Sequence, residues 1–213
     1  GKLTLSNCML LDNTAVYGGG IDSYRTPTVI EYSTFSGNDA RRGGGIEANY
    51  DTIRILGSTF TQNSADEDGG AIFCRRSTLD ITDSLLNNND SNDLGGAIYC
   101  DYDAIITLAN SVISENSARY SGGGIYNSSS AVTTLNSTIA SNSATRGGGV
   151  YLHDDSSSEL KNTILAGNEA SIEGSDAYQT SSAVLTGSHS LVGIYSETSG
   201  LVNGVDGNII GDQ

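Results

Sequence analysis

The sequence predicts an all-β fold, a single-stranded parallel β-helix of about seven rungs with 25 to 27 residues in each. Three observations support this prediction. A glycine-rich phrase returns at nearly even steps, an asparagine returns with it, and no stretch sustains the apolar period of a helix. Fixed-period repetition of this length is typical of stacked architectures, in which neighbouring copies bury each other's apolar faces.

The glycine phrase reads Gly-Gly-(Gly or Ala)-aliphatic and occurs six times. The copies begin at Gly18, Gly43, Gly69, Gly95, Gly122 and Gly147, so the steps are 25, 26, 26, 27 and 25 residues. A nucleotide-binding glycine loop is excluded, because the phrase repeats, no helix follows it and no Lys-Ser/Thr completes the motif. We expect the phrase to form a corner of the coil, where glycine permits positive φ or close backbone approach.

An asparagine precedes each glycine phrase, and a seventh copy follows the last one. A large apolar residue stands three positions before each asparagine, a small residue stands five before it, and an aliphatic residue recurs further upstream. The asparagines are Asn13, Asn38, Asn63, Asn89, Asn116, Asn142 and Asn168. The upstream aliphatics are Leu5, Ile30, Ile55, Ile81, Leu108, Leu135 and Leu160. In register, the amides are expected to form a buried hydrogen-bonded ladder, in which Asn63→Ala or Asn89→Ala costs about 1–3 kcal/mol.

The repeat also predicts the domain organisation. Each unit is expected to contain two or three short strands, stacked on the next rung at about 4.8 Å. Residues 1–170 form the repeated rungs, and residues 171–213 form a degenerate segment that finishes and partly covers the same coil. Because the chain begins inside the repeat, we expect it to be a piece of a longer chain.

Composition excludes several classes of partner. The net charge of −15 opposes binding to nucleic acid or to an anionic membrane surface, and no apolar run is long enough to span a bilayer. The three cysteines, Cys8, Cys74 and Cys100, form no CxxC motif. Cys74 and Cys100 occupy equivalent positions in adjacent copies, and we expect them to be free, buried thiols.

Two motifs carry a resemblance to a known family. Gly-Gly-Ala-Ile at 69–72 and 95–98, with Phe-x-x-Asn at 35–38 and 60–63, resembles the repeats of polymorphic outer-membrane proteins. More broadly, residues 3–170 resemble bacterial secreted right-handed parallel β-helix repeat proteins. The resemblance implies a right-handed coil and an extracellular or cell-surface location. Most copies here have Gly-Gly-Gly, and Leu or Ile in place of Phe, which favours the broader secreted family.

Acidic residues gather in the turn after the third and fourth asparagines. They are Asp66, Glu67, Asp68, Asp90 and Asp93, and basic residues occupy the same turn in the neighbouring copies. Carboxylate oxygens are the ligands that calcium prefers, so these residues are a candidate calcium site. The structural alternative, which we favour, is a surface ladder of salt bridges. No other cofactor is expected.

An aromatic residue recurs just beyond the glycine phrase. The register places Phe73, Tyr99, Tyr126 and Tyr151 in one column. Aromatic rings offer flat contact area, so an exterior column is a candidate surface for binding a polysaccharide or a protein. A stacking ladder without a binding role is the alternative. In an adjoining column Arg75 is expected above Asp101, with Tyr50, Arg76 and Tyr102 beside them.

The predicted function is that of a structural or adhesive segment of a bacterial secreted or cell-surface protein, without catalysis. The alternative is a polysaccharide-active enzyme, either a pectate-lyase-like lyase or a glycoside hydrolase. Its candidate residues are His153, Asp154 and Asp155 with Asp101 and Asp103, since such chemistry needs acids and bases clustered across adjacent rungs. A third reading is a calcium-stabilised spacer.

Overall fold

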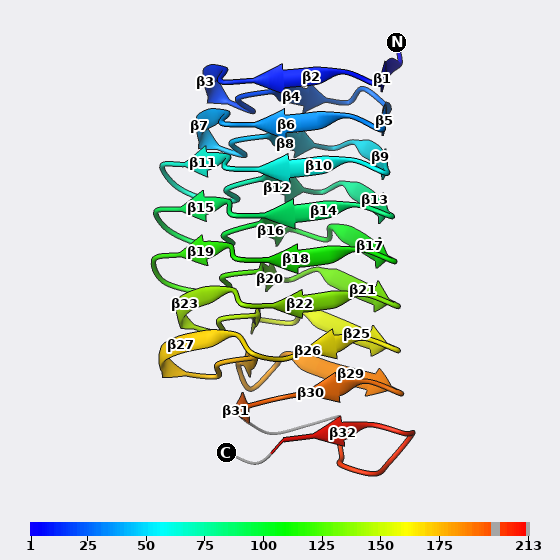
Figure 1. Ribbon diagram of the computed structural model, residues 1–213, viewed down its shortest axis with the longest axis vertical. Helices are drawn as coiled ribbons and strands as arrows, with labels where there is room; N and C mark the ends of the chain where they lie inside the picture. Colours follow the sequence, from blue (N-terminus) through cyan, green and yellow to red (C-terminus); the bar gives the residue numbers. More distant parts are fainter. Residues whose placement is uncertain (197–200, 212–213) are drawn as a thin grey trace.

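The computed structural model describes residues 1–196 and 201–211, and it contains strands and turns but no helix over those residues. Each rung consists of four strands, one in each of four parallel sheets that run the length of the molecule (Figure 1). Seven rungs are complete, and an eighth lacks one strand. The β-helix prediction is confirmed, but each complete rung has four strands, where the sequence predicted two or three.

The four sheets are named A to D in the order in which the chain visits them. Sheet A contains β1 (Leu3–Ser6), β5 (Thr28–Glu31), β9 (Thr52–Leu56), β13 (Thr78–Thr82), β17 (Ile105–Ala109), β21 (Ala131–Leu135), β25 (Ser157–Lys161) and β29 (Val184–Ser188). Sheet B contains β2 (Met9–Leu11), β6 (Thr34–Ser36), β10 (Thr59–Thr61), β14 (Leu85–Asn87), β18 (Val112–Ser114), β22 (Thr138–Ala140), β26 (Ile164–Leu165), β30 (Leu191–Val192) and β32 (Ile209–Ile210).

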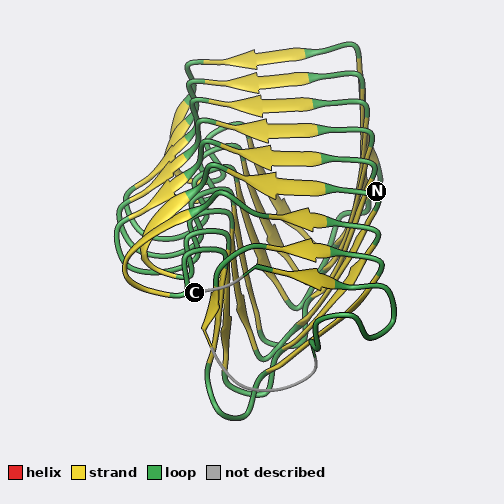
Figure 2. Cartoon of the chain, turned by 60° about the horizontal axis from the view of Figure 1, so that its bottom comes forward, coloured by secondary structure: helices red, strands yellow, loops and turns green. Residues whose placement is uncertain are grey.

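Sheets C and D complete each turn of the coil. Sheet C contains β3 (Thr14–Tyr17), β7 (Asp39–Arg42), β11 (Ser64–Ala65), β15 (Asp90–Ser91), β19 (Ser117–Ala118), β23 (Ser143–Arg146) and β27 (Glu169–Glu173). Sheet D contains β4 (Ile21–Tyr24), β8 (Ile46–Asn49), β12 (Ile72–Arg75), β16 (Ile98–Asp101), β20 (Ile125–Ser128), β24 (Val150–His153), β28 (Ala177–Gln179) and β31 (Tyr195–Ser196). Figure 2 shows that the sheet C strands project from the body as a side lobe.

The interior is filled by side chains that alternate along the strands, so that every second residue points inward. Ile30, Ile55 and Ile81 of sheet A stack in register and are fully buried, and Phe35 and Phe60 of sheet B stack with ring centres 4.5 Å apart. Burying these faces between rungs supplies the hydrophobic stabilisation that no single rung could provide.

One predicted member of the aliphatic ladder is wrong. Leu135 pairs with Ala109 and is 39% exposed, whereas Thr134 pairs with Leu108 and lies in the core. The inward position is the eighth before each asparagine, and in this copy it is a threonine. The Thr134 hydroxyl donates to Thr163 Oγ1 at 3.1 Å, which satisfies the polar group inside the core.

The glycine phrase forms the neck between the lobe and sheet D. Gly43 has a φ of +61°, which other residues rarely adopt. A Cβ on Gly44 would overlap the backbone oxygens of Ser64 and Gly70, so two chain segments meet there in backbone contact. The phrase is therefore a structural corner, as predicted.

The degenerate end continues the coil before it closes it. Gly174 has a φ of +68° and Ala177 pairs with Val150, so this segment takes the place of the missing seventh glycine phrase. β32 then pairs with β30 at the C-terminal end, where Leu201 joins the buried core. The other parts of this closing segment, residues 197–200 and 212–213, lie outside the described residues.

Candidate functional site

The asparagine ladder forms as predicted, and its role is structural. In each step from Asn13 to Asn168, the side-chain amide and the backbone N–H both donate to Oδ1 of the next asparagine, at 2.8 to 3.2 Å. Asn13, in the first rung, is exposed, and Asn38 to Asn168 are buried. These hydrogen bonds satisfy the buried amide and backbone N–H groups of the ladder, which would otherwise cost free energy because they are removed from water.

Sequence reasoning missed how this ladder ends. Asp176 accepts from the backbone N–H and the side-chain amide of Asn168 at 2.8 and 2.9 Å through Oδ1, and from the Ile194 N–H at 2.5 Å through Oδ2. A carboxylate only accepts, so it satisfies the last asparagine and needs no partner beyond it. Asp176 stands directly before Ala177, in the position that Gly149 holds before Val150 in the preceding rung. Alignment of the copies therefore shows where Asp176 lies, but not that it ends the ladder.

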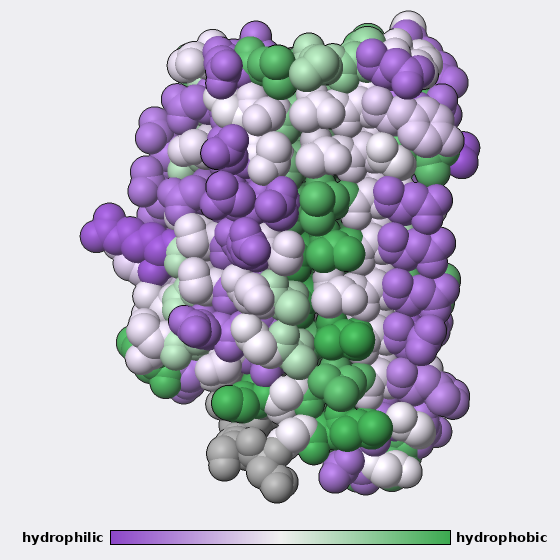
Figure 3. Space-filling view, viewed as in Figure 1, coloured by the Kyte–Doolittle hydropathy of each residue, from purple (hydrophilic) through white to green (hydrophobic). Residues whose placement is uncertain are grey.

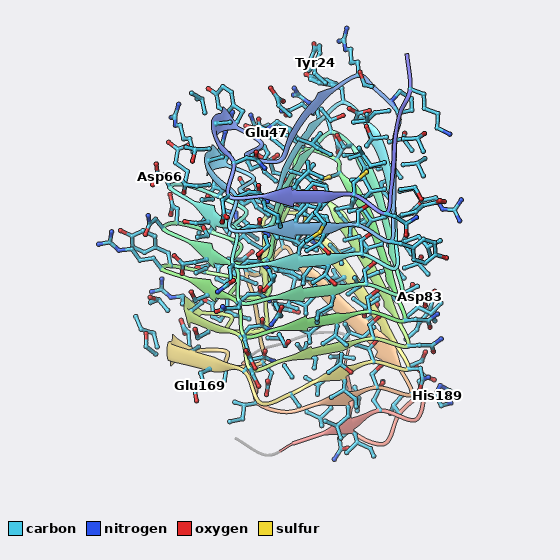
Figure 4. The ribbon with its side chains drawn as sticks, turned by 45° about the horizontal axis from the view of Figure 1, so that its top comes forward. Tyr24, Glu47, Asp66, Asp83, Glu169 and His189 are labelled. Carbon is cyan, nitrogen blue, oxygen red and sulfur yellow. The ribbon has the colours of Figure 1, made fainter. Side chains whose placement is uncertain are left out.

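A second, exposed ladder was also missed, at the corner between sheets A and B. Asn110 donates to Asp83 at 3.2 Å, Asn136 to Asn110 at 3.2 Å, and Asn162 to Asn136 at 2.8 Å. Asp83 and His189 mark this edge of the molecule in Figure 4. All of them have positive φ, which asparagine and aspartate tolerate better than most residues. The signal was an asparagine directly before the small residue in three consecutive copies.

The aromatic column forms in register and extends by one ring, Tyr178. Successive ring centres from Phe73 through Tyr99, Tyr126 and Tyr151 to Tyr178 are 5.0, 5.3, 5.3 and 5.1 Å apart, with nearly parallel planes. Each ring therefore covers the faces of its neighbours, and Phe73 and Tyr126 are buried. What the column presents outward is ring edges and hydroxyl groups, not the flat faces expected from the sequence. Binding by this column remains a prediction.

The N-terminal end of the aromatic column is closed by an ion pair. Glu47 pairs with Phe73 in the sheet register, is 1% exposed, and accepts from Asn49 at 2.7 Å and from Arg42 at 3.2 Å. Burial raises the pKa of Glu47, while the Asn49 hydrogen bond and the Arg42 charge oppose that rise. The Arg42 guanidinium lies between the Tyr17 and Phe73 rings at 4.8 Å from each.

A depression of about 350 Å³ lies on the outer face of sheet D, beside the aromatic column. Its floor is built on Asp101, which accepts from Arg75 at 2.9 to 3.3 Å and from the Tyr99 hydroxyl at 3.2 Å. The remaining lining residues are Tyr102, Tyr126, Ser128, Ser129, His153 and Asp154. Burial raises the pKa of Tyr99, with a further contribution from the Asp101 charge, so its hydroxyl stays protonated and donates. The depression thus combines aromatic edges with directed donors and acceptors.

The candidate catalytic residues divide between two sites. His153 Nδ1 lies 3.1 Å from Asp154 Oδ2, and both line the depression with Asp101. Asp103 and Asp155 line a separate shallow hollow around Ala104 and Ala131. Asp101 is occupied by Arg75 and Tyr99, whereas the His153 and Asp154 side chains are 39% and 59% exposed.

The acidic residues proposed as calcium ligands lie in and beside the lobe. Over the described residues, which include all five calcium candidates, no three His, Cys, Asp or Glu side chains lie close enough to hold a metal ion. Glu67 pairs with Arg41 at 2.6 Å, and Asp66 lies on the outer side of the lobe (Figure 4). Asp68 has a buried Oδ1 without a hydrogen bond, and burial together with the charges of Asp93 and Glu67 raises its pKa to about 7.

The cysteines are free, as expected. Cys74 and Cys100 pair in register and are fully buried, and burial raises the pKa of Cys74 to about 12. These thiols therefore behave as small core residues.

The outer face of sheet B carries a broken apolar stripe (Figure 3). Met9, Val112 and Ile164 are 69%, 38% and 47% exposed, but Thr34, Thr59 and Thr138 interrupt the same column. The threonines therefore break the stripe over the earlier rungs, whereas Ile164, Leu191 and Ile209 form an unbroken exposed run at its C-terminal end.

The four-sheet coil, its stacked ladders and its closed end define the protein as a β-solenoid. Residues 1–170 match the family described as the right handed beta helix region, so the chain belongs to the right-handed β-helix family. No curated protein and no solved structure matches the chain. None of the described residues forms a helix long and apolar enough to cross a membrane.

Proposed function

We propose that this chain is a structural segment of a bacterial secreted or cell-surface protein, and that it binds carbohydrate at the depression on sheet D. The observation that supports the proposal is the lining of that depression. Ring edges of Tyr99 and Tyr126 stand beside the hydrogen-bonding groups of Asp101, Ser128 and His153. Sugars present hydroxyl groups around an apolar ring, so a site for them combines aromatic surface with a few fixed polar groups.

The experiment is a glycan array, probed with and without calcium, using the wild type and two tyrosine variants. Tyr102→Ala removes an exposed ring that lines the depression, whereas Tyr120→Ala removes an equally exposed ring on the lobe. Loss of binding in Tyr102→Ala alone supports the proposal. Absence of binding to any glycan by the wild type, or equal loss in both variants, contradicts it. A requirement for calcium would favour the calcium-stabilised spacer.

A polysaccharide-active enzyme is the second candidate, favoured by the position of His153. Its Nδ1 lies 3.1 Å from Asp154 Oδ2, a contact that would orient the ring, and both side chains line the same depression. Incubation with polysaccharides tests this function through release of reducing or unsaturated sugar ends. Release that His153→Ala abolishes would establish the enzyme, and binding without release would support the structural role.

A further inference from the structure

Arginine and tyrosine alternate along the corner between sheets D and A. Arg25, Tyr50, Arg76 and Tyr102 follow the ends of β4, β8, β12 and β16, and each has a φ between 49° and 56°. Backbone hydrogen bonds from Arg25, Tyr50 and Arg76 to the next rung keep these turns in register. We call these four residues the Arg–Tyr column.

The guanidinium groups of this column lie over tyrosine rings. The Arg25 guanidinium carbon is 5.2 Å from the ring centres of both Tyr24 and Tyr50. That of Arg76 is 5.4 Å from the Tyr50 ring and 5.0 Å from the Tyr102 ring. Arg76 Nη1 also donates to the Tyr50 hydroxyl at 2.5 Å. These contacts hold the flexible arginine side chains in place, and the remaining guanidinium N–H groups can donate to a ligand.

The Arg–Tyr column is continuous with the depression. Tyr102 belongs to both, and the Arg75 guanidinium lies 4.8 Å from its ring on the side of the depression. At the other end Tyr24, 58% exposed, projects from the N-terminal rung (Figure 4). The combined surface therefore extends over several rungs, a length suited to a polymer rather than a single sugar.

The column is cationic on a molecule whose net charge is −15. Over the described residues Arg25 and Arg76 form no ion pair with a carboxylate. Asp51 directly follows Tyr50 but is buried, where its carboxylate accepts from Ser23 at 2.7 Å and from the Thr52 N–H at 3.1 Å. Two exposed cations are thus left without an acidic partner among many acidic residues.

We propose that the Arg–Tyr column binds an anionic polysaccharide that carries an acid group on alternate sugars. Guanidinium groups recognise carboxylates and sulfates in planar, paired hydrogen bonds, and the exposed tyrosine rings contact the sugar rings between them. Arg25 and Arg76 are two rungs apart, about 9.6 Å at the spacing of a β-sheet and close to the length of a disaccharide. The proposal rests on carbohydrate binding at the adjoining depression, and it names the chemical class of the ligand.

The test measures binding of three probes by titration calorimetry at low and high salt. A hyaluronan octasaccharide has a carboxylate on alternate sugars, a chito-oligosaccharide of similar length has no acid group, and poly-L-glutamate has acid groups without sugar rings. We expect hyaluronan to bind most tightly, with an affinity that decreases as salt screens the charges. Poly-L-glutamate binding as tightly as hyaluronan would overturn the proposal, because charge alone would then explain the binding.

Arginine variants identify the surface. We expect Arg76→Gln to weaken hyaluronan binding about tenfold or more, the loss of one charge-assisted hydrogen bond, and the double variant Arg25→Gln/Arg76→Gln to weaken it further. Arg119→Gln is the matched control, because Arg119 lies 5.2 Å from the Tyr120 ring on the lobe and also has no ion pair among the described residues. All these residues are exposed, so the variants should fold, as circular dichroism would verify.

The outcomes separate this inference from the proposed function. Chito-oligosaccharide binding that Tyr102→Ala abolishes, with no hyaluronan preference and no effect of the Arg25 and Arg76 variants, would overturn the inference and leave carbohydrate binding in place. No binding of hyaluronan would overturn the inference alone, and no binding to any glycan on the array would overturn both. An equal effect of Arg119→Gln would show that only net charge matters, which also overturns the inference.

Discussion

Replacing one asparagine in the middle of the buried ladder tests how the coil is held together. In Asn89→Ala the side-chain amide no longer donates to Asn116 at 2.9 Å, nor to the carbonyl oxygens of Phe60 and Asn87 at 3.1 Å. Oδ1 no longer accepts from the backbone N–H and the side-chain amide of Asn63, at 3.1 and 2.9 Å. The variant therefore loses five hydrogen bonds and leaves the Asn63 donors buried without this acceptor.

Because five hydrogen bonds are lost, the expected cost in unfolding free energy is about 2–4 kcal/mol, above the range of about 1–3 kcal/mol expected from the sequence. An unsatisfied buried donor costs about 1–3 kcal/mol, and the lost hydrogen bonds contribute more, although water in the space left by the side chain recovers part of it. Asn13→Ala is the matched control at the exposed end of the same ladder. It removes one side-chain donation, to Asn38 at 2.8 Å, and leaves no buried donor, so its cost should be below about 1 kcal/mol.

Urea unfolding followed by circular dichroism measures both variants against the wild type. The comparison requires that the wild type and both variants have the same m-value, the slope of unfolding free energy against urea concentration, because a repeat array can lose cooperativity. If Asn89→Ala and Asn13→Ala differed by less than about 0.5 kcal/mol, the ladder would not stabilise the coil in the way its geometry implies. A large cost for both variants would refute the distinction between the buried and exposed ends.

Three further variants test the buried carboxyl of Asp68, the glycine neck and the contact of Asp176 at the C-terminal end of the asparagine ladder. The pKa of Asp68 is raised to about 7 in the folded state, so the folded protein loses stability relative to the unfolded chain as pH rises from about 4 to 7. Asp68→Asn should therefore increase the unfolding free energy by about 1–2 kcal/mol at pH 8, seen as a higher melting temperature, and change it little at pH 4. An equal gain at both pH values would contradict this. Gly44→Ala should lower the unfolding free energy by about 1–3 kcal/mol or more in thermal melts, because the added Cβ meets backbone atoms. Gly45→Ala should cost less, since Ala71 occupies the equivalent site in the next rung, and equal costs for the two variants would be inconsistent with the packed neck. Asp176→Ala should speed amide hydrogen exchange in the last two rungs without affecting the first three, and uniform exchange along the coil would argue against a local end contact.

The repeat made most of the fold predictable, because each ladder is visible as a residue type at a fixed spacing. The asparagine and aromatic columns both follow from alignment of the copies. The prediction is wrong at Leu135 because this copy has an apolar residue one position after the inward site, which Thr134 occupies. The number of strands was not predictable, since the two-residue strands of sheet C, such as Ser64–Ala65, show no alternation.

The candidate site was less predictable than the fold, because it depends on which face of a side chain is left open. The register placed Tyr99 and Tyr126 in one column, but it could not show that stacked rings would cover each other. It placed Arg75 above Asp101, which the structure confirms as an ion pair at 2.9 Å. The two partners of Arg75 in the site, Asp101 and the Tyr102 ring, come from one neighbouring rung, and the contact with the ring depends on side-chain conformation, which the register does not give.

A residue that repeats in every rung has both its neighbours in the ladder, so its hydrogen bonds or ring faces are used inside the protein. Tyr126 illustrates this, since Tyr99 and Tyr151 cover its two faces. Where the residue type alternates, each side chain meets a different one above and below, and part of its bonding capacity stays free for a ligand. The Arg–Tyr column is of this second kind. Its arginines contact rings and Arg76 donates one N–H to the Tyr50 hydroxyl, which leaves the other guanidinium N–H groups available, and its tyrosines remain exposed at their outer side. For a coil whose repeated columns are saturated by stacking, the surface most able to bind is therefore one where the repeat is broken in a regular way.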